Sequence, residues 1–394
     1  MKIVHICLCG PMTDGLSYQE NVISKYHRKL GYKVTVIASQ WIWDKNGKLQ
    51  KTEKSNYVNA DGVKIIRIPI LNGDINNRLK RYPSLYENVE KEKPDILFIH
   101  DCQFIDICNL AKYVKKHNSV RTYVDNHVDY SNGAHGWLSK NILHKGLWRF
   151  CVRQIEPYVT RFYGVLPARV DFLKELYKIP PEKCELLVMG ADDELVGIAQ
   201  APGEREATRK KYSINAEDFL VVTGGKINAF RPETLDLMEA IIGCKNDSIK
   251  LVVFGSIDDS LKEKFDLLCQ SNKIDFVGWK NVEETYKLMN ASDLVVFPGL
   301  HSVMWEQAVA LGVPCIFRDI EGFHHVDIGG NALFLKDVTK ESLKGAIESL
   351  FGNPEQYRRM LSVAKKKGMQ YFSYKEISKR SIEQQNGGKK NVSV

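Results

Sequence analysis

Two loops in the second half of the chain carry side chains that could hold an anion. In the first loop, Gly224 and Gly225 follow the apolar run 219–223, and Lys226 and Arg231 flank the turn. The glycines allow a ligand to approach the backbone closely, and the two cations could neutralise a diphosphate. A plain turn with two solvated cations is the alternative.

The second loop, residues 298–302, includes Gly299 and His301 and precedes a predicted helix. Ser302 is expected to cap this helix, whose free backbone amides would then bind an anion. Glu306 lies one turn inside the helix, on a face that could reach a ribose. The alternative for Glu306 is a carboxylate that is simply solvated.

A third group lies in the first half, where Asp125, His127 and Asp129 alternate along an extended segment. Alternate residues of a strand share a face, so these three side chains are expected on one side. Their spacing resembles that of a mononuclear metal site, although hydrogen bonding among such residues is the commoner arrangement. His100 and Asp101 end another strand-like run and are expected at the same edge.

Other signals for metals and cofactors are weak or missing. His324, His325 and Asp327 form a weaker group of the same kind. The nine cysteines are scattered without a CxxC pair, which favours reduced thiols over a zinc site. The sequence has neither GxGxxG after its first strand nor GxxxxGK(S/T), which argues against dinucleotide cofactors and P-loop chemistry. We therefore expect no metal and no cofactor.

These side chains would be positioned by strand-like and helix-like segments that alternate along both halves. The predicted strands are residues 2–8, 33–39, 63–70, 95–100, 121–127, 219–225, 250–256, 274–279, 294–299 and 313–317. The predicted helices are residues 17–30, 84–93, 104–117, 141–156, 170–179, 232–243, 259–270, 282–290, 302–311, 339–352 and 354–368.

The strand-like segments are mostly continuous apolar runs, which are typical of parallel strands buried on both faces. The pattern therefore predicts two doubly wound α/β domains, residues 1–195 and 205–371, with a linker at about 194–204. In such domains ligands bind beyond the carboxyl ends of the strands and in the cleft between two domains.

Length and composition agree with this organisation. The 394 residues suffice for two or three domains, and 44% hydrophobic with 26% charged residues is typical of a soluble globular protein. No apolar run approaches the ~18 residues of a membrane span, and the first residues read as a strand rather than a signal peptide. A cytoplasmic protein is therefore expected.

Positive charge is concentrated in the first half. Of the net +8, residues 1–196 carry 29 Lys and Arg against 22 Asp and Glu. This asymmetry suggests an anionic partner, and nucleic acid, an acidic membrane surface and a phosphorylated substrate all fit it. Nucleic acid is not expected, because basic segments such as residues 78–82 lack the aromatic pattern of single-strand binders.

Several motifs together resemble the GT-B glycosyltransferases, specifically the family-4-like (group 1) enzymes that use nucleotide sugars. In the first half, Gly15 and Gly31 stand sixteen residues apart, as the corresponding glycines do in that family. Residues 94–100 are similar to the family's P-D-(I/V)-(I/V)…H strand. Residues 122–127 resemble the strand that carries an active-site histidine, here His127.

The most specific part of the resemblance lies in the second half. Lys226 and Arg231 have the spacing of the family's two diphosphate-binding cations, with the residue types exchanged. Glu306 aligns with the second glutamate of the E-x7-E motif, whereas Pro298 stands where the first would be.

Two further segments are similar to family features. Residues 276–280 resemble the loop whose backbone reads the base of the donor. Residues 372–375 resemble the segment that returns to the first domain, so the helix within 372–394 is expected to pack there.

The resemblance implies a GT-B fold and an enzyme that moves a sugar from a nucleoside diphosphate sugar, UDP-linked, to an acceptor hydroxyl, with retention and without a metal. It implies that the catalytic residues are His127, Lys226 and Arg231. The implied donor-binding residues are Gly15, Gly225, Lys226, Arg231, Trp279, Lys280, Gly299, His301, Ser302, Val303 and Glu306. The implied acceptor-side residues are His100, Asp101, His127 and Asp129.

The implied acceptor is a saccharide or a lipid-linked saccharide, in the synthesis of cell-surface polysaccharide or glycolipid. The basic first half favours contact with the anionic inner face of a membrane. Two rival functions remain open. A sugar-nucleotide epimerase of the same fold would turn over the donor without an acceptor, and a non-catalytic partner subunit would bind nucleotide without turnover.

Overall fold

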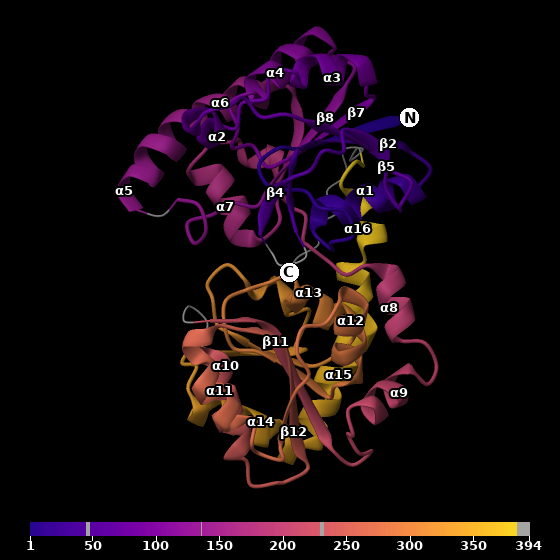
Figure 1. Ribbon diagram of the computed structural model, residues 1–394, viewed down its shortest axis with the longest axis vertical. Helices are drawn as coiled ribbons and strands as arrows, with labels where there is room; N and C mark the ends of the chain where they lie inside the picture. Colours follow the sequence, from indigo (N-terminus) through magenta and orange to yellow (C-terminus); the bar gives the residue numbers. More distant parts are fainter. Residues whose placement is uncertain (45–47, 135, 229–231, 384–394) are drawn as a thin grey trace. The chain divides into compact units, whose positions relative to one another are not determined.

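The computed structural model describes residues 1–44, 48–134, 136–228 and 232–383. The chain divides into two compact units (Figure 1), which are Met1–Met189 with the segment that begins at Tyr374, and Gly190–Ser373. Each unit is built on one large, mainly parallel sheet with helices on its faces. The predicted pair of doubly wound α/β folds is thus confirmed.

The sheet of the first unit has the strand order β10-β9-β8-β7-β1-β2-β6-β5. Its strands are β1 (Lys2–Cys7), β2 (Lys33–Ser39), β5 (Asn56–Val58), β6 (Lys64–Ile68), β7 (Ile96–His100), β8 (Arg121–Asn126), β9 (Val159–Gly164) and β10 (Cys184–Leu186). All neighbours are parallel except β5, which runs antiparallel to β6 at the edge. A separate antiparallel pair is formed by β3 (Trp41–Trp43) and β4 (Leu49–Lys51).

Helices bury both faces of this sheet. One face is covered by α1 (Gln19–Lys29) and α16 (Tyr374–Arg380), whose apolar residues pack with Ile3, Phe98 and Tyr123. The other face is covered by α3 (Leu85–Glu92), α4 (Ile107–Lys116), α6 (Arg149–Ile155) and α7 (Pro167–Glu175). The short α2 (Asp74–Leu79) has no buried residue. Helix α16 therefore packs on the first unit as expected from the sequence, and residues 384–394 of the expected segment lie outside the described residues.

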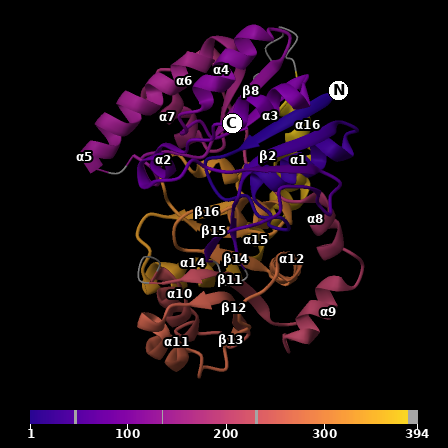
Figure 2. The same ribbon diagram turned by 45° about the horizontal axis from the view of Figure 1, so that its top comes forward.

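The sheet of the second unit is parallel throughout, in the order β13-β12-β11-β14-β15-β16, which can be followed in Figure 2. Its strands are β11 (Phe219–Ile227), β12 (Ile249–Ile257), β13 (Ile274–Phe276), β14 (Leu294–Phe297), β15 (Cys315–Arg318) and β16 (Ala332–Leu335). The helices of this unit are α8 (Asp193–Ala199), α9 (Glu204–Lys211), α10 (Glu233–Ile242), α11 (Lys262–Leu268), α12 (Val282–Ala291), α13 (Met304–Ala310), α14 (Lys340–Gly352) and α15 (Pro354–Phe372).

Each sheet has a switch point, where the strand order reverses direction: the chain first adds strands on one side of its first strand and then adds the next ones on the other side. In the first unit β1 lies between β7 and β2, and in the second unit β11 lies between β12 and β14. The loops after β1 and β7, and after β11 and β14, therefore diverge at the carboxyl ends of these strands. Such divergence leaves room for a ligand, and it locates one candidate site in each unit.

Three local expectations were wrong. The expected linker contains helix α8, because the Asp192 side chain caps its first turn and Val196 and Ala199 are buried. Gly224 and Gly225 lie in a strand as predicted, but β11 stays paired with β12 as far as Ile227, so the tight turn expected directly after Gly225 does not occur there. Strands β3, β4, β5, β9 and β10 were missed because they are short or include polar residues, and β16 was missed because its apolar run is only four residues long.

Candidate functional site

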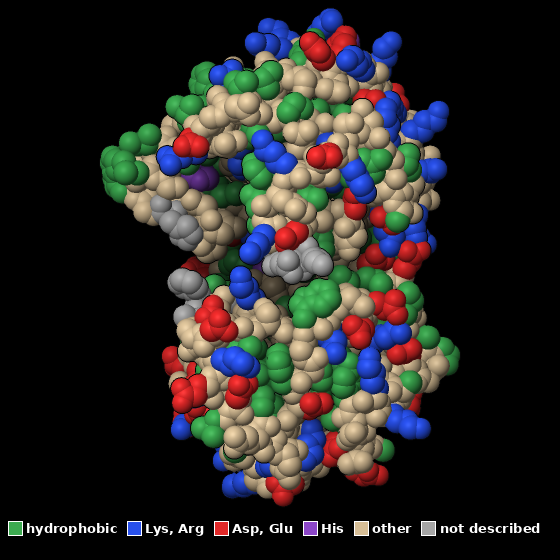
Figure 3. All heavy atoms as spheres, viewed as in Figure 1, with side chains coloured by type: hydrophobic (Ala, Val, Ile, Leu, Met, Phe, Trp, Pro, Cys, Tyr) green, Lys and Arg blue, Asp and Glu red, His purple; other side chains and the backbone are tan. Residues whose placement is uncertain are grey.

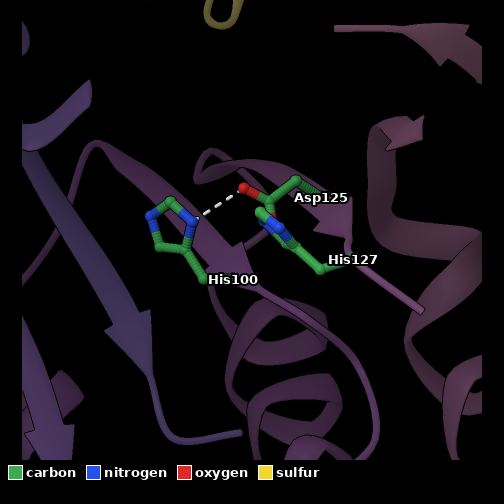
Figure 4. Close-up of side chains that lie close together, drawn as sticks. All are labelled: His100, Asp125 and His127. Carbon is green, nitrogen blue, oxygen red and sulfur yellow. Dashed lines mark hydrogen bonds and ion pairs between the residues drawn. The ribbon is translucent and has the colours of Figure 1, made fainter. Parts of the chain in front are cut away.

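The site of the first unit is built on His100 and Asp125, which are register partners at the ends of β7 and β8. His100 Nδ1 donates a hydrogen bond of 2.7 Å to Asp125 Oδ2 (Figure 4). Asp125 is fully buried, and burial by itself would raise the pKa of its carboxyl. The imidazoles of His100 and His127 outweigh burial and hold that pKa well below its ordinary value.

His127 comes directly after β8 and contacts the same carboxylate, that of Asp125. Its Nε2 lies 3.3 Å from Asp125 Oδ1, and its backbone N–H donates to Asp101 Oδ1 at 2.7 Å. Asp101 donates its own backbone N–H to Asp125 Oδ1 at 3.1 Å and adopts a left-handed φ of 62°. Burial acts to lower the pKa of His127, but Asp125 and then Asp101 raise it to about 9. His127 is therefore an imidazolium at neutral pH.

Asp129 does not share this arrangement, contrary to the expectation from its spacing. The strand ends at Asn126, so the alternation of faces is lost before Asp129. Its carboxylate instead accepts hydrogen bonds from Ser131 and lies 3.1 Å from Arg169 Nε. Asp125 is the carboxylate that orients His127.

Two buried histidines that the sequence reasoning missed extend this cluster. His5 of β1 lies within hydrogen-bonding distance of His100, and His27 of α1 lies within hydrogen-bonding distance of His5. The alternation of side chains along β1 could have indicated on which face of the sheet His5 lies. It could not have identified His100 as its partner, because that contact depends on which strand lies next to β1.

Donor atoms of His100, Asp125 and His127 lie within 4.8 Å of one another, as a metal site would require. Both ring nitrogens of His100 are already engaged, Nδ1 with Asp125 and Nε2 with His5. Hydrogen bonding alone therefore accounts for the orientation of the His100 ring.

The site of the second unit lies around Glu306, which is 0% exposed in α13. Glu306 Oε1 accepts hydrogen bonds from His301 Nε2 at 3.0 Å and from His325 Nε2 at 2.7 Å, and its Oε2 lies 3.2 Å from His301 Nε2. Burial would raise the pKa of Glu306, but His301 and His325 lower it to about 2. The carboxylate is thus a charged group that orients two imidazoles. Donor atoms of these three residues also lie within 4.8 Å of one another.

Other residues near α13 differ from the sequence expectation. The first helical turn is preceded by Val303 and has no side-chain cap, so Ser302 does not cap it. His324 and Asp327 do not join His325: His324 Nε2 lies 2.6 Å from Asp319, and Asp327 accepts from the amides of Gly329 and Gly330. Gly299 lies in the loop after β14, next to Glu233.

Gly225 and Lys226 lie at the end of β11, on the other side of this switch point. Gly225 has a φ of +123°, and a Cβ on Gly255 of β12 would meet the Gly225 carbonyl oxygen at 1.9 Å, so glycine is required at both positions. Lys226 is exposed and makes no ion pair with any residue in the described ranges. Arg231, its predicted partner, lies outside the described residues.

The remaining predicted site residues lie in loops. Trp279 follows β13 and is 74% exposed, and the ammonium of the adjacent Lys280 lies 5.7 Å from the centre of the Tyr212 ring. Gly15 lies in the loop after β1 with a φ of +79°, which explains why glycine is needed there.

Comparisons with known proteins agree with this architecture. The sequence model of the family described as "Glycosyl transferases group 1" matches residues 204–367. No curated protein sequence is significantly similar to the chain. Solved structures that cover nearly the whole chain include a glycosyltransferase from Rickettsia africae, with a TM-score of 0.66, 14% identity and 96% of each chain covered.

Two other similar structures are described with a bound ligand or with a biosynthetic process. The Anabaena protein HepE in complex with UDP has a TM-score of 0.66 and 14% identity, with 96% of this chain and 98% of that chain covered. WaaG, described as a glycosyltransferase involved in lipopolysaccharide biosynthesis, has a TM-score of 0.64 and 14% identity, with the same coverage. At these identities the likeness concerns the fold.

Proposed function

Residues 204–367 match the group 1 glycosyltransferases, and on that premise we propose that the chain is a member of this family and transfers a sugar from a UDP-linked donor to an acceptor hydroxyl. The observation that carries the proposal is the switch point of the second unit, where Lys226 is exposed near the end of β11 and makes no ion pair with the described residues, and where β14 is the neighbouring strand. A cation at this edge is suited to the diphosphate of a nucleotide sugar. The UDP bound to the Anabaena structure supports the choice of base.

The proposed reaction breaks the bond between the anomeric carbon and the diphosphate oxygen and forms a bond from that carbon to the acceptor oxygen. The acceptor proton leaves with the diphosphate, whose negative charge grows in the transition state. Lys226 and Arg231 would stabilise that charge without a metal, and retention of configuration needs no protein nucleophile. The exposed Trp279 offers a stacking surface for the base.

Glu306 has a different role in this proposal from the one its motif implied. Its side chain is 0% exposed and lies behind His301 and His325, whose ring nitrogens bond it, so ribose hydroxyls do not reach it in this structure. We propose that Glu306 acts on the donor through His301, which it holds beside Gly299. His127 of the first unit would contact the acceptor as an imidazolium, together with Asp101 and His100.

A thermal-shift screen with UDP, ADP and GDP and their sugars tests the function. A ligand at 100 times its Kd adds about 2.7 kcal/mol to stability, so UDP compounds are expected to raise Tm by several degrees while ADP and GDP do not. The best donor is then incubated with and without saccharide acceptors. Transfer supports the proposal, turnover without acceptor indicates an epimerase, and binding without any turnover indicates a non-catalytic subunit.

The first unit also presents a surface suited to an anionic membrane. Helix α5 (Gly136–Leu138), a π-helix (Ser139–Trp148) and α6 form one continuous segment. Residues 136–155 contain four Lys and Arg and no Asp or Glu. The segment exposes large apolar side chains, and Figure 3 shows hydrophobic side chains gathered at its α5 end. They include Trp137, Leu138, Ile142 and Phe150.

We propose that this segment lies on the anionic surface of a bilayer and holds the enzyme near a lipid-linked acceptor. None of the helices in the described ranges has the length and apolar character needed to traverse a bilayer. Binding would therefore combine shallow insertion of apolar side chains with attraction of about 1 kcal/mol for each nearby cation.

Sedimentation with vesicles tests this surface. The protein is expected to sediment with phosphatidylglycerol-containing vesicles at low salt and much less at high salt, because salt screens the attraction. Trp137→Ser with Phe150→Ser should abolish most of the binding, whereas Leu267→Ser, at a 64% exposed site of the second unit, should not. Equal binding by the double variant would contradict the proposed surface.

A further inference from the structure

Three buried imidazoles of the first unit form a continuous hydrogen-bonded row. His100 Nε2 lies 2.9 Å from His5 Nδ1, and His5 Nε2 lies 3.0 Å from His27 Nδ1. His27 Nε2 lies 2.9 Å from the carbonyl oxygen of Ser378 in α16. At the other end, His100 Nδ1 reaches Asp125. The row thus connects helix α16 to the carboxylate that holds His127.

The groups at both ends of this row are hydrogen-bond acceptors. This determines how many protons the ring nitrogens of the row must carry. The Ser378 carbonyl and the Asp125 carboxylate can only accept hydrogen bonds. The Ser381 hydroxyl, 3.0 Å from His27 Nε2, donates to the Ser378 carbonyl and so also accepts from His27. Four hydrogen bonds through three rings need four protons, whereas three neutral imidazoles supply three. One ring must therefore be doubly protonated, or one buried contact would lack its hydrogen.

The extra proton belongs on His100. Burial, followed by the neighbouring imidazoles, lowers the pKa of His5 well below its ordinary value. Burial also lowers the pKa of His27 to about 4. His100 is the ring of the three that bonds an anionic carboxylate, so a cation is least costly there.

We propose that His5 and His27 are positioning residues which keep His100 doubly protonated, so that His100 neutralises Asp125 on one side and limits the negative charge presented to His127. The protonated row neutralises part of the negative charge of Asp125, and the pKa of His127 depends on the charge that is left. This inference rests on the proposed function only in giving His127 a role at the acceptor.

Other titratable groups also face the row and His127. Glu20 of α1 lies near both His100 and His127, and burial raises the pKa of its carboxyl. Burial also raises the pKa of the Cys7 thiol in β1, which therefore stays neutral. Asp101 faces His127 from the loop after β7, and Arg169 of α7 faces it with a positive charge. None of these groups bridges two rings, so replacing a ring should change the row while leaving these groups in place.

The ¹⁵N spectrum of histidine-labelled wild-type protein tests the proton count directly. Two protonated ring nitrogens have similar shifts, whereas a neutral ring has one protonated and one bare nitrogen with widely different shifts. At neutral pH we expect His100 to show two protonated nitrogens, and His5 and His27 to be protonated at Nε2 only. A neutral His100 would overturn the proposal, whether or not the protein transfers sugar.

A pair of variants at one position tests the effect on His127. His5→Leu keeps an apolar side chain in the core but interrupts the row, so His100 should become neutral and the titration of His127 should move up by about one pH unit. In His5→Gln the amide oxygen can accept from His100 and the amide N–H can donate to His27, so the wild-type titration should return. An unchanged His127 in His5→Leu would overturn the proposal.

A control variant and a pH profile of transfer check this interpretation. His117→Gln, at a surface contact with Glu90, is the control and should leave the His127 titration unchanged. If transfer is observed, its pH profile should shift with His127 in His5→Leu and return in His5→Gln. If His5→Leu does not fold, the wild-type spectrum still decides the proton count.

Discussion

Replacing both Lys226 and Arg231 with alanine is expected to reduce kcat/KM for sugar transfer by at least about 100-fold, equivalent to about 2.7 kcal/mol. Lys226 lies one residue before the end of β11 at the switch point, exposed and without an ion pair among the described residues, and Arg231 follows at the spacing of a second diphosphate ligand. The loss should be larger in kcat than in the affinity for UDP, because the diphosphate gains charge as the bond breaks.

The matched control for this variant removes two cations from the surface of the same unit. Lys262→Ala with Arg359→Ala interrupts two exposed ion pairs, with Asp266 and Glu355, and should leave transfer unchanged. Steady-state rates and calorimetric titration with UDP give the two readouts. Transfer and donor hydrolysis near wild-type rates in Lys226→Ala/Arg231→Ala would remove the diphosphate assignment.

Glu306→Gln is expected to lower the free energy of unfolding by about 3 kcal/mol at neutral pH. A glutamine oxygen in the place of Oε1 could still accept from His301 and His325, but it carries no negative charge, and the amide NH2 would replace the oxygen that lies 3.2 Å from His301 Nε2. Hydrogen bonds to a charged group contribute about 1.5–3 kcal/mol each. Urea denaturation of both proteins measures the difference. Affinity for UDP should fall with it, because His301 loses the group that orients it.

The contribution of Glu306 to the free energy of unfolding should decrease as the pH falls. Its pKa is lowered from an ordinary 4.5 to about 2, so its stabilising contribution is complete above pH 4.5 and is lost as the pH falls towards 2. The wild-type protein and Glu306→Gln should therefore converge in stability in acid. Glu355→Gln, at an exposed ion pair, is the control and should match the wild type throughout. Unchanged UDP affinity in Glu306→Gln would remove Glu306 from the donor site.

The sheets were predictable because each central strand is a local feature. Runs such as residues 33–39 and 95–100 are apolar enough to be recognised on their own, and the helix-like segments between them imply parallel pairing. The same reasoning ended the strand at residues 219–225 too early, because Gly224 and Gly225 permit close packing on β12 and β11 continues to Ile227. It also predicted a linker at residues 194–204, whereas Asp193–Ala199 forms helix α8.

The residues of the candidate sites likewise fall into those that the sequence predicted and those that it did not. Glycines and cations at strand ends, such as Gly225 and Lys226, were identified from the sequence because their chemistry and their place in an element are both local. The partners of the buried histidines were not identified. His325 reaches Glu306 from 19 residues further on, and His5 reaches His100 across 95 residues.

The sequence by itself therefore determined two α/β units, the strand ends at which ligands can bind, and the cations and glycines placed there. Only the tertiary structure decided that Asp125 rather than Asp129 orients His127, and that Glu306 is buried beneath two imidazoles. The physical reason is that strand and helix formation depend on neighbouring residues. The pairing of a buried charge depends on strand order and register, which bring together residues far apart in the chain.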